Sequence, residues 1–166
     1  MNAGAMGGSV FDVVERVRMM DLEGNAIEKL PAELGVSYRA CAGLRGHAAL
    51  SAILKGRPAE RREIDERLKE FEGRRRASQP AASSAGCIFK NPPNLSAGKL
   101  IDEAGLKNLR FGGARVSDEH ANFIVNDGGA TAGDVLSLIS LVKERVRQER
   151  AIELEIEVVV VGDERW

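Results

Sequence analysis

Residues 84–92, Ser-Ala-Gly-Cys-Ile-Phe-Lys-Asn-Pro, bring several reactive side chains together in a short stretch. Cys87 directly follows a glycine, on a turn that enters a short apolar segment, and Lys90 and Asn91 come soon after it. A thiol has a reference pKa of about 8.5, so at neutral pH it is mostly protonated and can donate a proton. The segment therefore predicts a ligand site with a proton donor, a cation and an amide. The structural alternatives are a buried, inert Cys87 and a simple turn role for Asn91 before Pro92.

Arg39 and Glu157 carry charges that suit an anionic substrate. A guanidinium can form two parallel hydrogen bonds with a carboxylate, although a lone arginine after a tyrosine is usually a surface cation. Glu157 ends the run Glu-Leu-Glu-Ile-Glu, in which alternate residues share one face of a strand. The alternative there is a solvated edge strand. A carboxyl group that assists protonation beside an anion would need a raised pKa.

Two further stretches offer cations or accessible backbone. Arg75 and Arg76 belong to a triple arginine that is either a solvated helix end or a contact to a diphosphate, and we weigh the two equally. The N-terminal segment has small residues, which let a flat ring approach the backbone, or it is simply flexible. Its candidate residues are Asn2, Ala3, Gly4 and Ala5.

Helices and strands alternate irregularly along the chain, which predicts an α+β fold. The elements predicted in the first part are a hairpin over 13–20 and 26–30, a helical turn over 31–35 and a charged helix over 58–72. Gly73 is expected to stop or break that helix. The run 47–54 is apolar, and its periodicity does not distinguish a buried strand from a helix.

The second part has clearer boundaries. Ser96 is predicted to cap a helix that ends before Gly105, and Thr131 to cap a longer helix with one apolar face. The predicted strands cover 109–111, 122–126 and 154–161, the last being an inner strand because it contains four consecutive valines.

Composition excludes several classes of protein. The 166 residues have 24 Lys and Arg against 25 Asp and Glu, and a formal net charge of -1 argues against binding to nucleic acid or to an anionic membrane. No apolar run approaches the roughly 20 residues of a membrane span. The two cysteines and two histidines lack metal-ligand spacing, so we expect no metal site and, in a reduced cytoplasm, no disulfide.

Several motifs in order make the chain resemble the UDP-N-acetylenolpyruvoylglucosamine reductases, also called UDP-N-acetylmuramate dehydrogenases. The family signature Ser-Ala-Gly-Ser-x-Phe-Lys-Asn-Pro matches residues 84–92, with Cys87 in place of the usual serine. The other matching stretches are 1–8, 37–39, 96–105, 112–117, 120–126 and 154–158. The resemblance covers nearly the whole chain, and it favours a strand over 47–54.

The resemblance implies an activity and a role for each candidate residue. The family uses FAD and NADPH to reduce the enolpyruvyl ether of a UDP-sugar to UDP-N-acetylmuramate, a peptidoglycan precursor made in the cytoplasm. It implies that Cys87 is the general acid, that Glu157 assists protonation or stabilises the enolic intermediate, and that Arg39 meets the substrate carboxylate. FAD contacts are implied for the N-terminal segment. The implied substrate contacts are Lys90, Asn91, Arg75 and Arg76.

The same resemblance implies how the chain is organised. Residues 1–80 are expected to be the remainder of a flavin-binding domain with a connecting helix, and residues 81–166 a small α+β substrate-binding domain. We therefore expect the chain to be the C-terminal part of a longer enzyme, with the N-terminal half as a partner. The alternative is a non-catalytic module that binds a sugar nucleotide.

Overall fold

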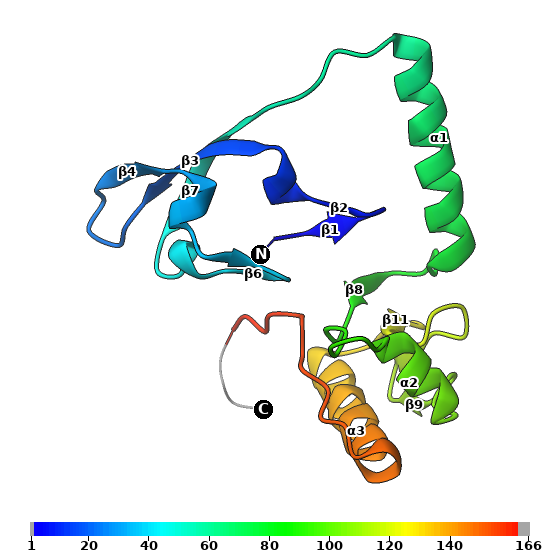
Figure 1. Cartoon of the computed structure of the whole chain (residues 1–166). Helices are drawn as coiled ribbons and strands as arrows, with labels where there is room; N and C mark the ends of the chain where they lie inside the picture. The colour runs from blue at the N-terminus through cyan, green and yellow to red at the C-terminus, as the bar shows by residue number, and fades with distance from the viewer. Residues whose placement is uncertain (1, 163–166) are drawn as a thin grey trace. The chain divides into compact units, whose positions relative to one another are not determined.

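The structure is a computed structural model that describes residues 2–162. The chain forms two compact units, the first ending at Phe71 and the second beginning at Glu72. Strands and helices are mixed along the chain (Figure 1), which confirms the predicted α+β class. Within residues 2–162, no helix has both the length and the apolar character that a membrane span requires.

The first unit is built from short antiparallel strands and single turns of 3-10 helix. Its strands are β1 (Gly4–Ala5), β2 (Gly8–Ser9), β3 (Val14–Met20), β4 (Ala26–Lys29), β5 (Val36–Ser37), β6 (Ala40–Cys41) and β7 (Ala48–Leu54). Its 3-10 turns are η1 (Val10–Asp12), η2 (Pro31–Glu33) and η3 (Ala42–Leu44). The larger sheet has the order β4-β3-β7, and β1–β2 and β5–β6 are separate hairpins. The predicted β3–β4 hairpin and the turn at η2 are confirmed.

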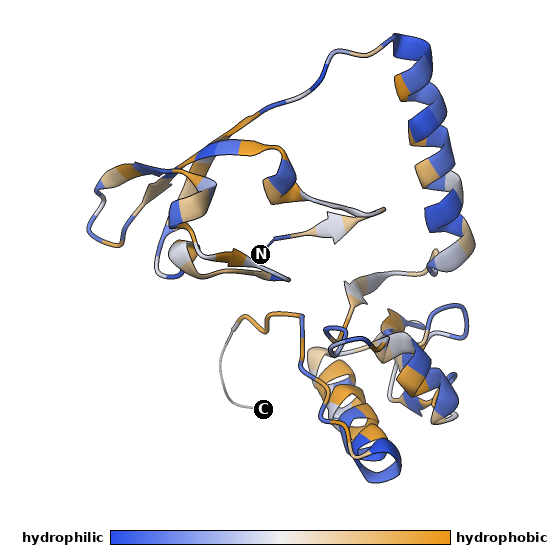
Figure 2. Cartoon of the chain, in the orientation of Figure 1, coloured by the Kyte–Doolittle hydropathy of each residue, from blue (hydrophilic) through white to orange (hydrophobic). Residues whose placement is uncertain are grey.

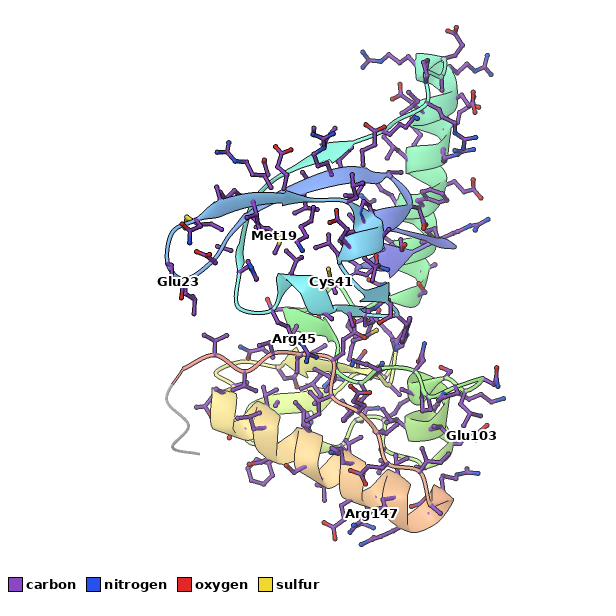
Figure 3. All side chains as sticks on the ribbon, turned by 60° about the vertical axis from the view of Figure 1, so that its left-hand side comes forward. Met19, Glu23, Cys41, Arg45, Glu103 and Arg147 are labelled. Carbon is purple, nitrogen blue, oxygen red and sulfur yellow. The ribbon has the colours of Figure 1, made fainter. Side chains whose placement is uncertain are left out.

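The buried core of the first unit is small. It consists of Val17 and Met19 from β3, Leu34 after η2, and Cys41 at the end of β6. Figure 3 labels Met19 and Cys41, whose sulfur-bearing side chains belong to this cluster. The strand that the resemblance favoured over 47–54 is confirmed as β7, but its expected burial is wrong. All seven residues of β7 are exposed, and β7 lies at an edge of its sheet.

Helix α1 (Arg61–Ser78) corrects the expectation about Gly73. The helix continues through the glycine for five more residues, although a glycine in a helix interior costs roughly 1 kcal/mol relative to alanine. Ion pairs one turn apart help to hold it, as between Arg62 and Glu66 at 2.8 Å and between Glu72 and Arg76 at 3.7 Å. The triple arginine therefore lies on the helix rather than in a connection after it.

The second unit is a four-stranded antiparallel sheet with two helices. Its strands are β8 (Ser84–Cys87), β9 (Arg110–Phe111), β10 (Ala114–Val116) and β11 (Phe123–Asn126), in the order β8-β11-β10-β9. Its helices are α2 (Ala97–Glu103) and α3 (Ala132–Arg150), and α3 packs against β9, β10 and α2. Figure 2 shows that α3 carries more apolar colour than α1, as expected for a helix with a buried face. That face is Leu138, Ile139, Val142 and Val146.

Side-chain caps fix the start of both helices in the second unit. The Ser96 hydroxyl accepts from the Lys99 N–H at 3.3 Å, and the Thr131 hydroxyl accepts from the Asp134 N–H at 3.1 Å. The Asp134 carboxylate accepts in return from the Thr131 N–H at 3.0 Å, which completes a capping box. The predicted caps are confirmed, as is Gly105 after the end of α2, with a positive φ of 68°.

The predicted inner strand over 154–161 is wrong. Only Ile156 makes a bridge, to Phe89, and Val159, Val160 and Val161 are exposed. Leu154 is buried in the core, so the segment enters the unit and then leaves it. A run of valines favours extended backbone, but a ladder requires a partner strand along its whole length.

An ion-pair network holds β10 against the loops that flank it. Arg115 donates to the side chains of Asn108 at 2.8 Å and Asp118 at 3.0 Å. The carboxylate of Asp127 pairs with Arg110 and also with Arg115. Hydrogen bonds from Arg110 and then from Arg115 lower the pKa of Asp127, and the hydrogen bond from Arg115 lowers the pKa of Asp118.

Candidate functional site

A β-bulge sets the position of Cys87. Cys87 pairs with Phe123 and Ser84 pairs with Val125, so β8 has one more residue than β11 between these pairs. Gly86 adopts a φ of +82° inside the bulge, a conformation that glycine reaches without steric cost. Bulges redirect the side chains that follow them, and Cys87, which is half-buried, is the next residue. This explains why a glycine directly precedes the thiol.

Two large apolar side chains and one buried amide hold the segment after Cys87. Ile88 and Phe89 are both buried in the core of the second unit. The side chain of Asn122, also buried, accepts from the Phe89 N–H at 2.9 Å and donates to the Phe89 carbonyl at 2.8 Å. The Asn122 side chain thus forms with Phe89 the two hydrogen bonds that the backbone of a neighbouring strand would form. The backbone that carries Cys87 is fixed on both sides of the thiol.

Asn122 is a residue that the sequence interpretation did not single out. Its signal was a polar side chain at the start of a predicted buried strand, because a buried amide must find hydrogen-bond partners. His120 supports the same region by packing, since its ring lies 4.9 Å from that of Phe123 and its Nδ1 accepts from the Asn122 N–H at 3.2 Å. Burial lowers the pKa of His120, which keeps the ring neutral at pH 7.

Glu157 lies beside the segment that follows Cys87. Its N–H donates to the Ile88 carbonyl at 2.8 Å, and the Lys90 N–H donates to the Glu155 carbonyl at 2.8 Å. These two bonds flank the bridge between Phe89 and Ile156 in an antiparallel arrangement. The structure therefore brings the backbone of Glu157 to the residue next to Cys87.

The remaining substrate candidates have structural contacts of their own. The ammonium group of Lys90 pairs with the carboxylate of Glu155. The Asn91 side chain accepts from the Ala97 N–H at 3.0 Å, at the first residue of α2. Arg75 Nε donates to the side chain of Gln79 at 3.1 Å, and Arg76 pairs with its neighbour one turn earlier. Both arginines are exposed in the last turns of α1.

In the first unit, Arg39 and the N-terminal segment share a hollow of about 380 Å³. Asn2, Gly4, Ala5 and Arg39 line it, whereas Ala3 is outside the lining and its carbonyl accepts from the Val10 N–H at 2.8 Å. Arg39 Nη2 donates to the Gly4 carbonyl at 3.2 Å. The structure thus collects three of the four cofactor candidates around one catalytic candidate.

Two tight turns shape this hollow. Met6 and Gly7 both have positive φ, 51° and 82°, the arrangement of a type I′ turn between paired strands. Arg39 has a φ of 53°, which costs a non-glycine residue roughly 1–2 kcal/mol. Its guanidinium lies 5.0 Å from the centre of the Tyr38 ring and reaches the Gly4 carbonyl. These contacts help to hold Arg39 in its strained conformation.

Within residues 2–162, no three His, Cys, Asp or Glu side chains gather as metal ligands.

The candidate residues form two groups, one in each unit. In the first unit, the guanidinium of Arg39 shares a hollow with the N-terminal segment. In the second unit, Cys87 and Lys90 lie on one segment and Glu157 on the segment whose backbone is hydrogen-bonded to it.

Comparison with known proteins finds relatives that cover both units. Residues 79–161 match the family profile described as "UDP-N-acetylenolpyruvoylglucosamine reductase, C-terminal domain". UDP-N-acetylenolpyruvoylglucosamine reductase 2 of Symbiobacterium thermophilum is 43% identical over 169 residues, which cover 100% of this chain and 54% of that protein. The reductase of Heliobacterium modesticaldum is 45% identical over 98% of this chain and 53% of its own length.

A solved structure extends the similarity to three dimensions. The crystal structure of UDP-N-acetylenolpyruvylglucosamine reductase from Thermus caldophilus superposes with a TM-score of 0.83 at 44% identity, over 95% of this chain and 56% of that one. The chain spans about half the length of the curated relatives that it matches. It belongs to the UDP-N-acetylenolpyruvoylglucosamine reductase family.

Proposed function

We propose that this chain forms the C-terminal part of an enzyme that reduces UDP-N-acetylenolpyruvoylglucosamine to UDP-N-acetylmuramate in the cytoplasm. The observation that carries the proposal is the match along the entire chain to a reductase at 43% identity. Because the chain spans 54% of that relative, we assign the complete reaction to this chain together with the part that it does not span. The reaction supplies a precursor of peptidoglycan.

In the proposed reaction, Cys87 is the proton donor. When bound, FAD reduced by NADPH supplies a hydride to one carbon of the enol ether. The Cys87 thiol protonates the adjacent carbon, so the carbon–carbon double bond becomes single and the thiolate takes its proton back from water. A general acid must be held close to the carbon that it protonates. Two features support this role for Cys87: the bulge at Gly86, and the pair of hydrogen bonds, here called the Asn122 clamp, between the Asn122 side chain and the Phe89 backbone.

Arg39 and Glu157 are proposed to act on the charge that develops on the substrate. A guanidinium binds a carboxylate through two parallel bonds, which would orient the enolpyruvyl group and spread the negative charge of the enolic intermediate. We assign Glu157 to assisting protonation or stabilising that intermediate, because its backbone is bonded to the residue after Cys87. Further substrate contacts are proposed for Lys90, Asn91, Arg75 and Arg76.

The residues around Gly4 fit the edge of a flat ring. A Cβ atom on Gly4 would lie 2.9 Å from the Gly8 carbonyl and 3.1 Å from Arg39 Nη1, so only glycine lets these two groups approach its backbone so closely. The neighbouring lining residues Asn2 and Ala5 are also small. We therefore propose that the segment of Asn2, Ala3, Gly4 and Ala5 would hold the flavin, with Arg39 beside it. Asn2, Gly4 and Ala5 would face the flavin from the lining of the hollow, and Ala3 would fix the segment through its bond to Val10.

The second candidate function is a sugar-nucleotide-binding module without catalysis. Its support is that the chain spans only about half of its relatives, while the second unit has its own buried core. Titration calorimetry with UDP-N-acetylglucosamine and visible absorbance of the purified chain separate the readings. The reductase proposal expects substrate-dependent oxidation of NADPH when FAD and the unmatched segment of the Symbiobacterium reductase are added. Sugar-nucleotide binding without any such oxidation would favour the module, and neither binding nor oxidation would overturn both.

A further inference from the structure

Asn122 holds both residues that follow Cys87. Its carbonyl accepts from the Ile88 N–H at 2.9 Å, and its side chain forms the Asn122 clamp on Phe89. Asn122, Ile88 and Phe89 are all buried, and Cys87 itself pairs with Phe123, the residue after Asn122. The backbone on which the thiol is mounted therefore stays in place only while Asn122 does.

The N–H of Asn122 is held by the ring of His120. It donates to His120 Nδ1 at 3.2 Å. A ring nitrogen that accepts carries no hydrogen, so the ring is neutral and its hydrogen is on Nε2. Protonation would add a hydrogen to Nδ1, and two donors would then face each other. The N–H of a buried residue would lose its partner, which is unfavourable.

The ring of His120 is packed so that it cannot easily turn away from this bond. The Ser117 hydroxyl accepts from the His120 N–H at 3.3 Å, and the His120 carbonyl accepts from the Phe123 N–H at 2.9 Å. The His120 ring also lies 4.9 Å from the Phe123 ring, and a Cβ atom on Gly98 of α2 would lie 3.0 Å from its Cε1. A change in the charge of the ring therefore acts directly on the Asn122 N–H.

Burial and a nearby lysine keep the ring neutral at pH 7. Burial, and to a smaller extent the charge of Lys107, lowers the pKa of His120, and Lys107 itself pairs with Asp102 of α2 at 2.8 Å. The other charged side chains on α2 and on the turn of His120 are Lys99 and Glu103, which pair with each other, Asp118, which pairs with Arg115, and Glu119. Strand β11 carries no titratable side chain. The ring therefore takes up a proton only below its ordinary value of about 6.5.

We propose that His120 is a positioning residue: its neutral ring keeps the Asn122 clamp closed, and its protonation weakens the clamp and loosens the backbone beside Cys87. The inference rests on the proposed function in one respect, that Cys87 donates the proton to the substrate. A general acid must stay close to the carbon that it protonates, so a weakened clamp slows that step. Substrate reduction then declines in acid because of His120, a residue that needs no contact with the substrate.

The first test uses the full chain without flavin, NADPH or substrate. NMR titration follows the ionisation of the His120 ring, and hydrogen exchange gives the protection factor of the Phe89 amide at each pH. Once the clamp opens, the ring titrates near its ordinary pKa of about 6.5, so protection should begin to fall there. We expect a loss of about tenfold between pH 7.5 and pH 5, which levels off where the ring titrates in the folded chain.

Two matched variants separate the charge of the ring from its presence. His120→Asn keeps an acceptor near the position of Nδ1, because the Asn side-chain oxygen is as many bonds from the backbone, but it does not titrate. It should hold the Phe89 protection within about threefold of the wild type at pH 7.5 and remove its fall in acid. His47→Asn changes the other histidine, which lies in the first unit, and should leave the wild-type pH dependence in place.

The second test measures the reaction in a mixture of the chain, the unmatched segment of the Symbiobacterium reductase, FAD and NADPH. The kcat for substrate reduction should fall about tenfold between pH 7.5 and pH 5 in the wild type, and much less in His120→Asn. The effect should fall on kcat rather than on KM, because His120 is assigned no substrate contact.

Three results would overturn the inference. They are a His120 ring that stays neutral until the second unit unfolds, a Phe89 protection that does not fall in acid, and the same pH dependence in the wild type and His120→Asn. A Phe89 protection that follows the His120 charge, in a mixture that reduces no substrate at any pH, would instead leave the control of the clamp by His120 intact. That result would count against the proposed function.

Discussion

The side chain of Asn122 forms both hydrogen bonds that a neighbouring strand would form with Phe89, at 2.9 Å to its N–H and 2.8 Å to its carbonyl. Phe89 lies two residues after Cys87, at the point where the chain leaves β8. A buried amide that replaces a strand partner fixes one residue without extending the sheet. This leaves room for the segment around Ile156 to approach Phe89 from another side.

Asn122→Ala should destabilise the second unit by about 2–4 kcal/mol, because it leaves the N–H and the carbonyl of Phe89 buried without these partners. Urea denaturation and the exchange rate of the Phe89 amide measure the loss. Gln148→Ala is the control, since Gln148 is exposed and its side chain donates to Glu144 one turn earlier in α3, so a change under about 0.5 kcal/mol is expected. Equal effects of the two substitutions would mean that the clamp contributes nothing specific.

Local signals predicted much of the second unit. Ser96, Thr131 and Gly105 mark helix ends through backbone bonds that involve only nearby residues, so the sequence alone identifies them. The valine run after Leu154 failed as a strand because pairing depends on a distant partner. Gly73 does not end α1, because the free-energy cost of one glycine in a helix is smaller than the combined stabilisation from the neighbouring residues of the helix.

The candidate site was predictable in part. The Gly-Cys order in residues 84–92 indicated a turn before the thiol, and the structure adds that the turn is a bulge in β8. The sequence could not indicate that Asn122 clamps Phe89, because the two residues are 33 positions apart and their contact depends on the register of β8 and β11. Likewise, the bond from Arg39 to the Gly4 carbonyl joins two separate hairpins.

Gly113→Ala should destabilise the second unit by about 1–3 kcal/mol through overpacking. A Cβ atom there would lie 2.5 Å from the backbone N of Ala130 and 2.8 Å from the Gly128 carbonyl, and backbone atoms cannot move aside cheaply. Thermal unfolding by calorimetry measures the change. Gly73→Ala is the matched control. It meets open space in α1 and should stabilise the helix by about 0.5–1 kcal/mol, so a stabilising Gly113→Ala would contradict the packing at Ala130.

The pairing of Arg115 with Asp118 and Asp127 should make the free energy of unfolding depend on pH in the acidic range. Both carboxyl groups have pKa values lowered in the folded chain, so below about pH 5 the unfolded chain binds more protons. Their contribution is complete at neutral pH and is lost as the pH falls through the folded-state values. Arg115→Met should therefore reduce the urea midpoint more at pH 7 than at pH 3.

Arg145→Met, on the exposed side of α3, is the control for removing a positive charge at both pH values. Its effect on the urea midpoint should be similar at pH 7 and pH 3. If the two arginine substitutions show the same pH dependence, the network around Asp127 does not govern the acid sensitivity.

Cys87→Ala should abolish substrate reduction in the complex of this chain with the unmatched segment of a relative, while the reduction of FAD by NADPH continues. The proposed proton donor is then missing, but the hydride source remains. Cys87→Ser should retain activity, because a hydroxyl is the group that the family signature carries at this position. Stopped-flow absorbance of the flavin separates its reduction from its reoxidation by substrate. Cys41→Ala controls for the loss of a thiol, since Cys41 belongs to the core of the first unit. Reoxidation of the Cys87→Ala flavin by substrate at the wild-type rate would assign the proton to another group.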